Sequence, residues 1–166
     1  MRRFVPVVLI ASCASSEPDV TTAKIESLEY AVPAGWKARD LSNPNNGAMF
    51  EWTPDGANER KESLVVSRVP QPALAKSRPH LRRVLGKATQ ALPLASFHQP
   101  TPFVTRGGLS GVRTEGRFTP PGKAEPYHRT HAVLADKESL VHVLYTARDP
   151  DREHIGVVLD GFKAGE

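Results

Sequence analysis

Six histidines are the residues of this chain best suited to bind a metal or move a proton near neutral pH. Two of them, His131 and His142, fall in the segments Tyr127 to Ala135 and Ser139 to Ala147, which have the short apolar runs of buried β-strands. If the two strands turn at Asp136-Lys137, His131 lies directly opposite His142 on one side of a sheet. Two imidazoles so placed form a candidate ligand-binding pair.

A zinc or copper site needs a third or fourth ligand beside such a pair. Glu125, Asp136 and Glu138 are close to it only in sequence, and no cysteine is near. We therefore expect no bound metal and no other cofactor. The alternative hypothesis is a soluble periplasmic ligand-binding or metal-binding protein, or an enzyme, that uses His131 and His142.

A glycine-rich stretch, Gly107 to Gly111, surrounds Ser110. Its spacing is G-x-S-G rather than the G-x-S-x-G of a nucleophile elbow, and the pattern that follows predicts a strand and not a helix. No phosphate-binding G-x-x-x-x-G-K-[ST] motif occurs in the sequence. These patterns favour a protein that is not an enzyme and does not bind nucleotides.

The single cysteine, Cys13, follows two arginines, an apolar run from Phe4 to Ala11, and small residues. This order is typical of a secretory signal, and the run is too short to span a bilayer as a helix. The segment from Leu9 to Cys13, LIASC, resembles the lipobox of bacterial lipoproteins. That resemblance implies cleavage before Cys13 and acylation of its thiol with lipids such as palmitate.

The lipobox resemblance divides the chain into a signal peptide at residues 1–12, a lipidated cysteine with a flexible tether at 13–23, and a body at 24–166. It implies a protein anchored by lipid to a membrane on its periplasmic side. Ala14 and Ser15 follow Cys13 where an aspartate marks inner-membrane retention, which favours the outer membrane. The bilayer, reached through acylated Cys13, is thus the first expected partner.

The composition describes one soluble domain. The 166 residues are 39% hydrophobic and 24% charged, which is typical of a globular protein with a core of its own. The net charge is +4, and without Arg2 and Arg3 it falls to +2, since 20 basic residues then face 18 acidic ones. So small a surplus, without aromatic residues interleaved among the basic ones, argues against nucleic-acid binding.

The hydrophobic periodicity predicts an α+β fold with a mainly antiparallel sheet of about six strands and helices packed on its faces. A meander of three strands from Leu109 to Ala147 is its centre, and Arg113, Glu115 and Arg117 form a wet face on the first strand. A last helix has Asp149 as its cap. The other expected elements are strands at Lys24 to Val32, Ala48 to Thr53 and Glu62 to Val69, a helix at Arg78 to Leu92, and an edge strand or extended loop at Ser96 to Arg106.

The basic residues of the first helix lie together on one face. They are Arg78, Arg82, Arg83 and Lys87. This face is either solvated or directed at anionic headgroups beside the anchor.

Several short motifs of the body are similar to PsbP-like and DcrB-like domains: VPAGW at Val32 to Trp36, SLVVSRV at Ser63 to Val69, the glycines before the meander, and a final helix that runs into Gly161-Phe162. The family includes extrinsic photosystem proteins, bacterial lipoproteins and chaperone-like adaptors, and most members are not enzymes. The resemblance implies a binding or assembly module with a protein partner. An adaptor or immunity-like partner of a secreted toxin is the second alternative that it implies.

Overall fold

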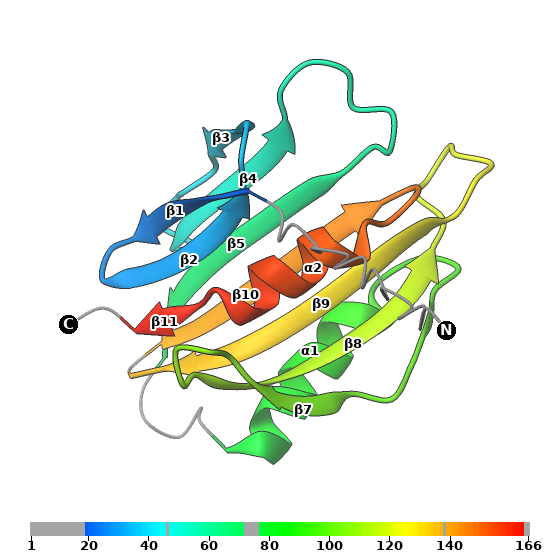
Figure 1. Cartoon of the computed structure of the whole chain (residues 1–166). Helices are drawn as coiled ribbons and strands as arrows, with labels where there is room; N and C mark the ends of the chain where they lie inside the picture. Colours follow the sequence, from blue (N-terminus) through cyan, green and yellow to red (C-terminus); the bar gives the residue numbers. More distant parts are fainter. Residues whose placement is uncertain (1–18, 46, 72–76, 138, 165–166) are drawn as a thin grey trace, which may run out of the picture.

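The structure is a computed structural model that describes residues 19–45, 47–71, 77–137 and 139–164. These residues form two helices and two antiparallel sheets (Figure 1). The elements are β1 (Val20–Ile25), β2 (Leu28–Pro33), β3 (Trp36–Asp40), β4 (Ala48–Pro54), β5 (Ser63–Pro70), α1 (Arg78–Gln90), β6 (Ser96–Phe97), β7 (Thr101–Val104), β8 (Ser110–Phe118), β9 (Tyr127–Asp136), β10 (Ser139–Ala147), α2 (Arg152–Asp160) and β11 (Lys163–Ala164).

The larger sheet has eight strands in the order β3-β4-β5-β10-β9-β8-β6, with β7 also paired to β8. The predicted meander is confirmed as β8, β9 and β10, which pair with each other in sequence order. β10 pairs with β5 on its other side, so both β9 and β10 are interior strands. The α+β class and the antiparallel sheet are confirmed, with more strands than the six expected.

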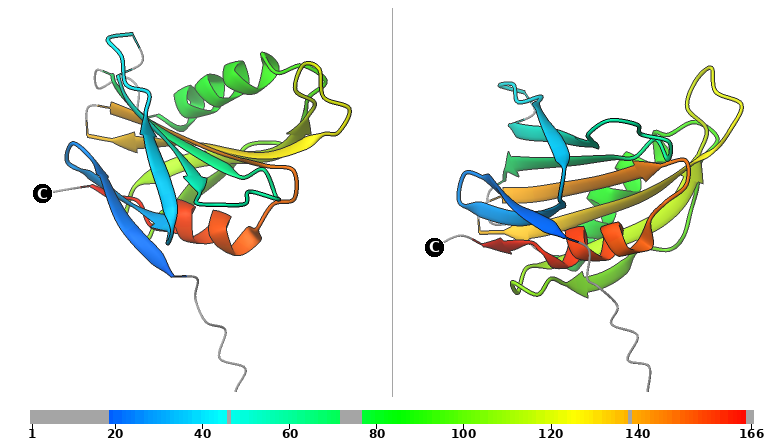
Figure 2. Two further views of the ribbon diagram at one scale, coloured as in Figure 1. Left: turned by 90° about the horizontal axis from the view of Figure 1, so that it is seen from above. Right: turned by 45° about the horizontal axis from the view of Figure 1, so that its top comes forward.

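The two helices cover opposite faces of this sheet (Figure 2). Leu81 and Leu85 of α1 pack against Val112, Val133 and Leu140 on one face. The opposite face holds the larger part of the core, where α2 and the smaller sheet pack together. The meander strands are apolar on both sides because both of their faces are covered.

The smaller sheet, in the order β1-β2-β11, corrects the prediction of a single strand from Lys24 to Val32. Ile25 instead ends β1 and pairs with Leu28 at the start of β2. The chain turns between them, with Glu26 in the left-handed region at φ 52°. β1 also begins at Val20, inside the segment predicted as a tether, and residues 1–18 lie outside the described part of the chain.

Both helices begin at a capping side chain. Ser77 caps α1, with its hydroxyl accepting a hydrogen bond from the backbone N–H of His80 at 3.4 Å. The cap of α2 is Asp151 and not Asp149, because the Asp151 carboxylate accepts hydrogen bonds from the N–H groups of Glu153 and His154. Among the described residues, neither helix has the length and apolar character needed to cross a bilayer.

Candidate functional site

The predicted pair His131 and His142 lies on one face of the sheet, but not in the predicted register. Asp136 pairs with Ser139, so His131 faces Leu144 and His142 faces Val133. The prediction of directly opposed histidines was wrong by two residues, because the hairpin turns one position later than Asp136-Lys137. A shift of two keeps side chains on their face, and the two ring centroids are 5.9 Å apart.

Both histidines are held in their neutral form on the α1 side of the sheet. Only 2% of His131 is exposed, and neither of its ring nitrogens has a hydrogen-bond partner among the described residues. Burial, followed by the nearby His142 and Arg129, lowers the pKa of His131 to about 3. Burial also lowers the pKa of His142.

Nothing in the described part of the chain completes a metal site at this pair. No cluster of three or more His, Cys, Asp or Glu side chains occurs in residues 19–45, 47–71, 77–137 and 139–164. Ligand binding by His131 and His142 stays a prediction. Cys13 lies outside the described residues, so its lipidation also stays a prediction.

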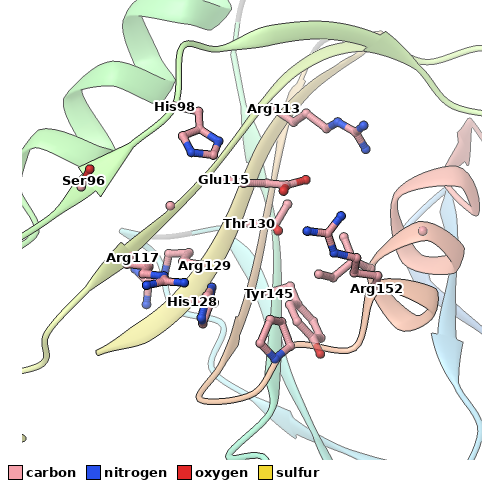
Figure 3. Close-up of a pocket in the computed structure, with 14 residues that line it drawn as sticks. Ser96, His98, Arg113, Glu115, Arg117, His128, Arg129, Thr130, Tyr145 and Arg152 are labelled. Carbon is pink, nitrogen blue, oxygen red and sulfur yellow. The ribbon is translucent and has the colours of Figure 1, made fainter. Parts of the chain in front are cut away.

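A cavity with a volume of about 520 Å³ lies on the opposite face, between α2 and strands β8 and β9 (Figure 3). Ligand sites in proteins commonly have volumes of about 300 to 1,000 Å³. Pro150, Arg152, Ile155 and Gly156 form its helical wall. The sheet forms the other wall, and the cavity is large enough for a small polar ligand.

Cross-strand pairing places the polar residues of the sheet wall in rows. Glu115 of β8 pairs with Thr130 of β9, and Thr130 pairs in turn with Tyr145 of β10. In the next row Arg117 pairs with His128. Glu115 and Thr130 lie in the middle of the cavity, Tyr145 lies below them, and Arg152 reaches toward them from α2 (Figure 3).

Three arginines of the cavity, Arg113, Arg117 and Arg152, form no ion pair within the part of the chain that the structure describes. Arg113 lies over the ring of Phe103, with 5.7 Å between its guanidinium carbon and the ring centroid. Arg129 differs from them, since its guanidinium bonds Thr146 on the other face of the sheet. Three guanidinium groups therefore remain available to a ligand.

The remaining charges near the cavity are few. Glu115 is the one carboxylate among the described residues that line it. The pKa of His128 is lowered, first by burial and then by the positive charge of Arg117, so His128 is neutral at pH 7. Four arginines line the cavity, but the guanidinium of Arg129 is bonded to Thr146 on the other face of the sheet. The other three arginines less Glu115 give the cavity a formal charge of +2.

A buried hydrogen-bond network fixes the floor of the cavity. The Tyr145 hydroxyl donates to the Glu62 carboxylate at 2.6 Å and accepts from the backbone N–H of Asp151 at 3.1 Å. Burial and the contact with Glu62 raise the pKa of Tyr145 well above its ordinary value. Asp151 in turn accepts a hydrogen bond from Arg60 at 2.5 Å. This network joins the end of β10 to the start of α2, which forms the cavity's second wall.

Sequence reasoning found part of this site without identifying it as one. The alternation of Arg113, Glu115 and Arg117 predicted a wet face on β8, and that face is one wall of the cavity. The contribution of Arg152 was not predicted, because its position opposite β8 depends on how α2 packs. The cluster of basic residues on α1 is exposed and lies on the other side of the sheet.

Comparisons with family models and with curated proteins found no match. Solved structures do resemble the domain. PsbP (CyanoP) of Synechocystis sp. PCC 6803 has a TM-score of 0.58 and 18% identity over 93% of this chain and 98% of its own. LpqN of Mycobacterium tuberculosis, described as involved in cell envelope biogenesis, has a TM-score of 0.53 and 12% identity over 89% of this chain and 91% of its own.

A protein from Bacteroides thetaiotaomicron has a TM-score of 0.58 and 11% identity over 90% of this chain. The chain spans about half of that protein, 49% of its length. At these identities the likeness concerns the fold alone. The fold of this chain is therefore an α+β fold similar to that of PsbP.

Proposed function

We propose that this protein is a non-enzymatic binding module of the cell envelope, held at a membrane through acylated Cys13. The observation that supports it is the cavity between α2 and the sheet, where Arg113, Arg117 and Arg152 form no ion pair with any of the described residues. An Arg side chain normally gains from a carboxylate or phosphate partner, so unpaired guanidinium groups in a concave site favour a ligand.

The residues around the cavity favour binding over catalysis. Ser96, Glu115 and Tyr145 line it, but within the described chain no two of its lining side chains are hydrogen-bonded to each other. Nucleophilic catalysis needs a nucleophile beside a base that is oriented by a third group. The one hydroxyl here with a carboxylate partner, that of Tyr145, points to buried Glu62.

The envelope location rests on the leader and on the fold. The leader resembles that of bacterial lipoproteins, and a fold of this kind occurs in LpqN, which is described as involved in cell envelope biogenesis. We place the domain on the periplasmic side and favour the outer membrane. A ligand or a protein partner would meet the cavity there.

The binding role is tested by filling the cavity from α2. Gly156 lines the cavity, and a Cβ added there would meet nothing within 4 Å, so Gly156→Leu can direct a side chain into the cavity without a clash at its Cβ. Gly86→Leu is the matched control, because Gly86 lies within α1 and has equally open space. Both changes replace a glycine that disfavours a helix by about 1 kcal/mol, so neither variant should unfold.

The readout is the change in backbone amide NMR signals when small polar compounds of different charge are added, such as glycerol 3-phosphate, glucose and choline. We expect at least one compound to shift the amides of β8, β9 and α2 in the wild type and in Gly86→Leu. Gly156→Leu should lose the response. If no compound shifts these amides, or if both variants respond alike, the binding role is refuted.

The anchoring role is tested by labelled palmitate. The wild-type chain should incorporate the label and the Cys13→Ala variant should not. A wild-type chain that takes up no label would refute the proposed anchor.

A further inference from the structure

The chemistry of the cavity walls also indicates what kind of ligand the cavity takes. Arg113 and Arg117 stand two residues on either side of Glu115, so all three side chains leave the same face of β8. At about 3.3 Å per residue, each arginine is about 7 Å along the strand from the glutamate. Arg152 approaches from α2 on the opposite wall (Figure 3). The positive groups therefore surround the cavity instead of lying on one flat surface.

Positive groups on both walls of a concave site favour an anion. A cleft lined by one sign of charge concentrates the electric field and attracts the opposite charge. The planar guanidinium of arginine also offers paired donors that match the oxygens of phosphate or carboxylate. The formal charge of +2 leaves the site able to neutralise such a group.

Glu115 adds a second requirement that the ligand must meet. Its carboxylate is exposed and accepts no hydrogen bond from Arg113, Arg117 or Arg152 among the described residues. An ionised carboxylate accepts hydrogen bonds only, so the ligand group that faces it must be a donor. Thr130 lies beside it in the same cross-strand row and adds a hydroxyl. A hydroxyl on the ligand fits both of these residues.

We infer that the cavity binds a small hydroxylated anion, whose phosphate or carboxylate group is held by Arg113 and Arg152 and whose hydroxyl groups donate to Glu115. This inference rests on the proposed binding function and adds the chemical class of the ligand. A phosphate that carries glycerol hydroxyls has this chemistry as a soluble molecule and as the headgroup of phosphatidylglycerol.

The test is isothermal titration calorimetry of the full chain at pH 7 with glycerol 3-phosphate, inorganic phosphate and glycerol. We expect glycerol 3-phosphate to bind more tightly than inorganic phosphate, and glycerol not to bind. Arg113→Gln and Arg152→Gln each remove a hydrogen bond between charged groups, so each should lower the affinity about tenfold or more. Arg82→Gln removes the same charge from the exposed face of α1, and it should change the affinity by less than about twofold.

A Glu115→Ala variant tests the second requirement. Removing the negative charge should strengthen the binding of inorganic phosphate, while the preference for glycerol 3-phosphate over phosphate becomes smaller. Co-sedimentation with vesicles of phosphatidylglycerol or phosphatidylcholine then distinguishes the two sources. If the ligand is a lipid headgroup, the protein should sediment with phosphatidylglycerol vesicles and not with phosphatidylcholine vesicles, and Arg152→Gln should weaken this binding. If the ligand is a soluble molecule, glycerol 3-phosphate should bind in calorimetry while the protein does not sediment with either kind of vesicle.

The inference is overturned if glycerol 3-phosphate does not bind at millimolar concentration, or if Arg82→Gln weakens binding as much as Arg152→Gln does. Either result is distinct from failure of the binding role. If neutral or cationic compounds occupy the cavity and Gly156→Leu excludes them, the binding role stands and the anionic ligand class is wrong. If Gly156→Leu leaves every response unchanged, the binding role itself fails.

Discussion

The hydroxyl of Tyr145 is a single group that holds the floor of the cavity to α2, and its removal tests this part of the structure. Tyr145→Phe keeps the ring in the core and deletes only the oxygen. The Glu62 carboxylate, in a residue that is 4% exposed, then loses a donor at 2.6 Å, and the backbone N–H of Asp151 loses its acceptor. Few waters can reach Glu62 to replace that donor.

The expected cost follows from these two hydrogen bonds. A hydrogen bond to a charged group contributes about 1.5 to 3 kcal/mol, and an ordinary one about 1 kcal/mol. Tyr145→Phe should therefore lower the free energy of unfolding by about 2 to 4 kcal/mol. In a domain of this size, each kcal/mol lost lowers the melting temperature by about 2 to 4 °C. The melting temperature of Tyr145→Phe should therefore fall by about 4 to 16 °C.

A second buried tyrosine provides the control. The Tyr30 hydroxyl accepts a hydrogen bond from the indole N–H of Trp52 at 3.1 Å, and its ring stacks on Phe162. Tyr30→Phe loses a bond between neutral groups and should cost about 0.5 to 1.5 kcal/mol. Urea unfolding of both variants, followed by circular dichroism, measures the difference. If Tyr145→Phe costs no more than Tyr30→Phe, the assignment of a charged, buried partner to Tyr145 is refuted.

Two predictions concern pH. Hydrogen bonds from Lys163 and then Lys24 lower the pKa of Glu29 to about 2, from an ordinary 4.5, so this group adds stability above pH 4.5 that is lost as the pH falls toward 2. In Glu29→Gln, the free energy of unfolding measured in urea should depend less on pH over this range and less on salt concentration. The same dependence on pH as in the wild type would contradict this prediction. His131 has a pKa of about 3 against an ordinary 6.5, so the unfolded chain takes up a proton first and stability falls as the pH drops from 6.5 to 3. His131→Leu should match the wild type at pH 7 and exceed it by about 2 to 3 kcal/mol at pH 4.5, and equal values at pH 4.5 would count against a buried, neutral imidazole.

The elements with a regular hydrophobic period could be predicted from the sequence. The alternation in β8, the apolar runs of β9 and β10 and the helical spacing of α1 each reflect burial against neighbours. The turn between β1 and β2 was missed, because Glu26-Ser27 carries none of the glycine, proline or asparagine that usually predicts a turn. β3 was missed because its side chains are half-buried or exposed and leave no apolar pattern.

The site was less accessible to prediction because it depends on contacts between distant segments. The shared face of His131 and His142 could be deduced from strand periodicity, but their register required the position of the turn. The cavity needs α2 to cross β8 and β9, and no local pattern fixes that placement. The three arginines on its walls come from positions 113, 117 and 152, so only the folded chain brings them together.

The position of β2 between β1 and β11 has a consequence for how the domain is completed during synthesis. One edge of β2 pairs with β1, the strand just before it. The other edge pairs with Lys163 and Ala164 of β11, which are synthesised near the end of the chain. The stacking of Tyr30 on Phe162 depends on the same late segment. A growing chain therefore leaves this edge of β2 unpaired until β11 has been made.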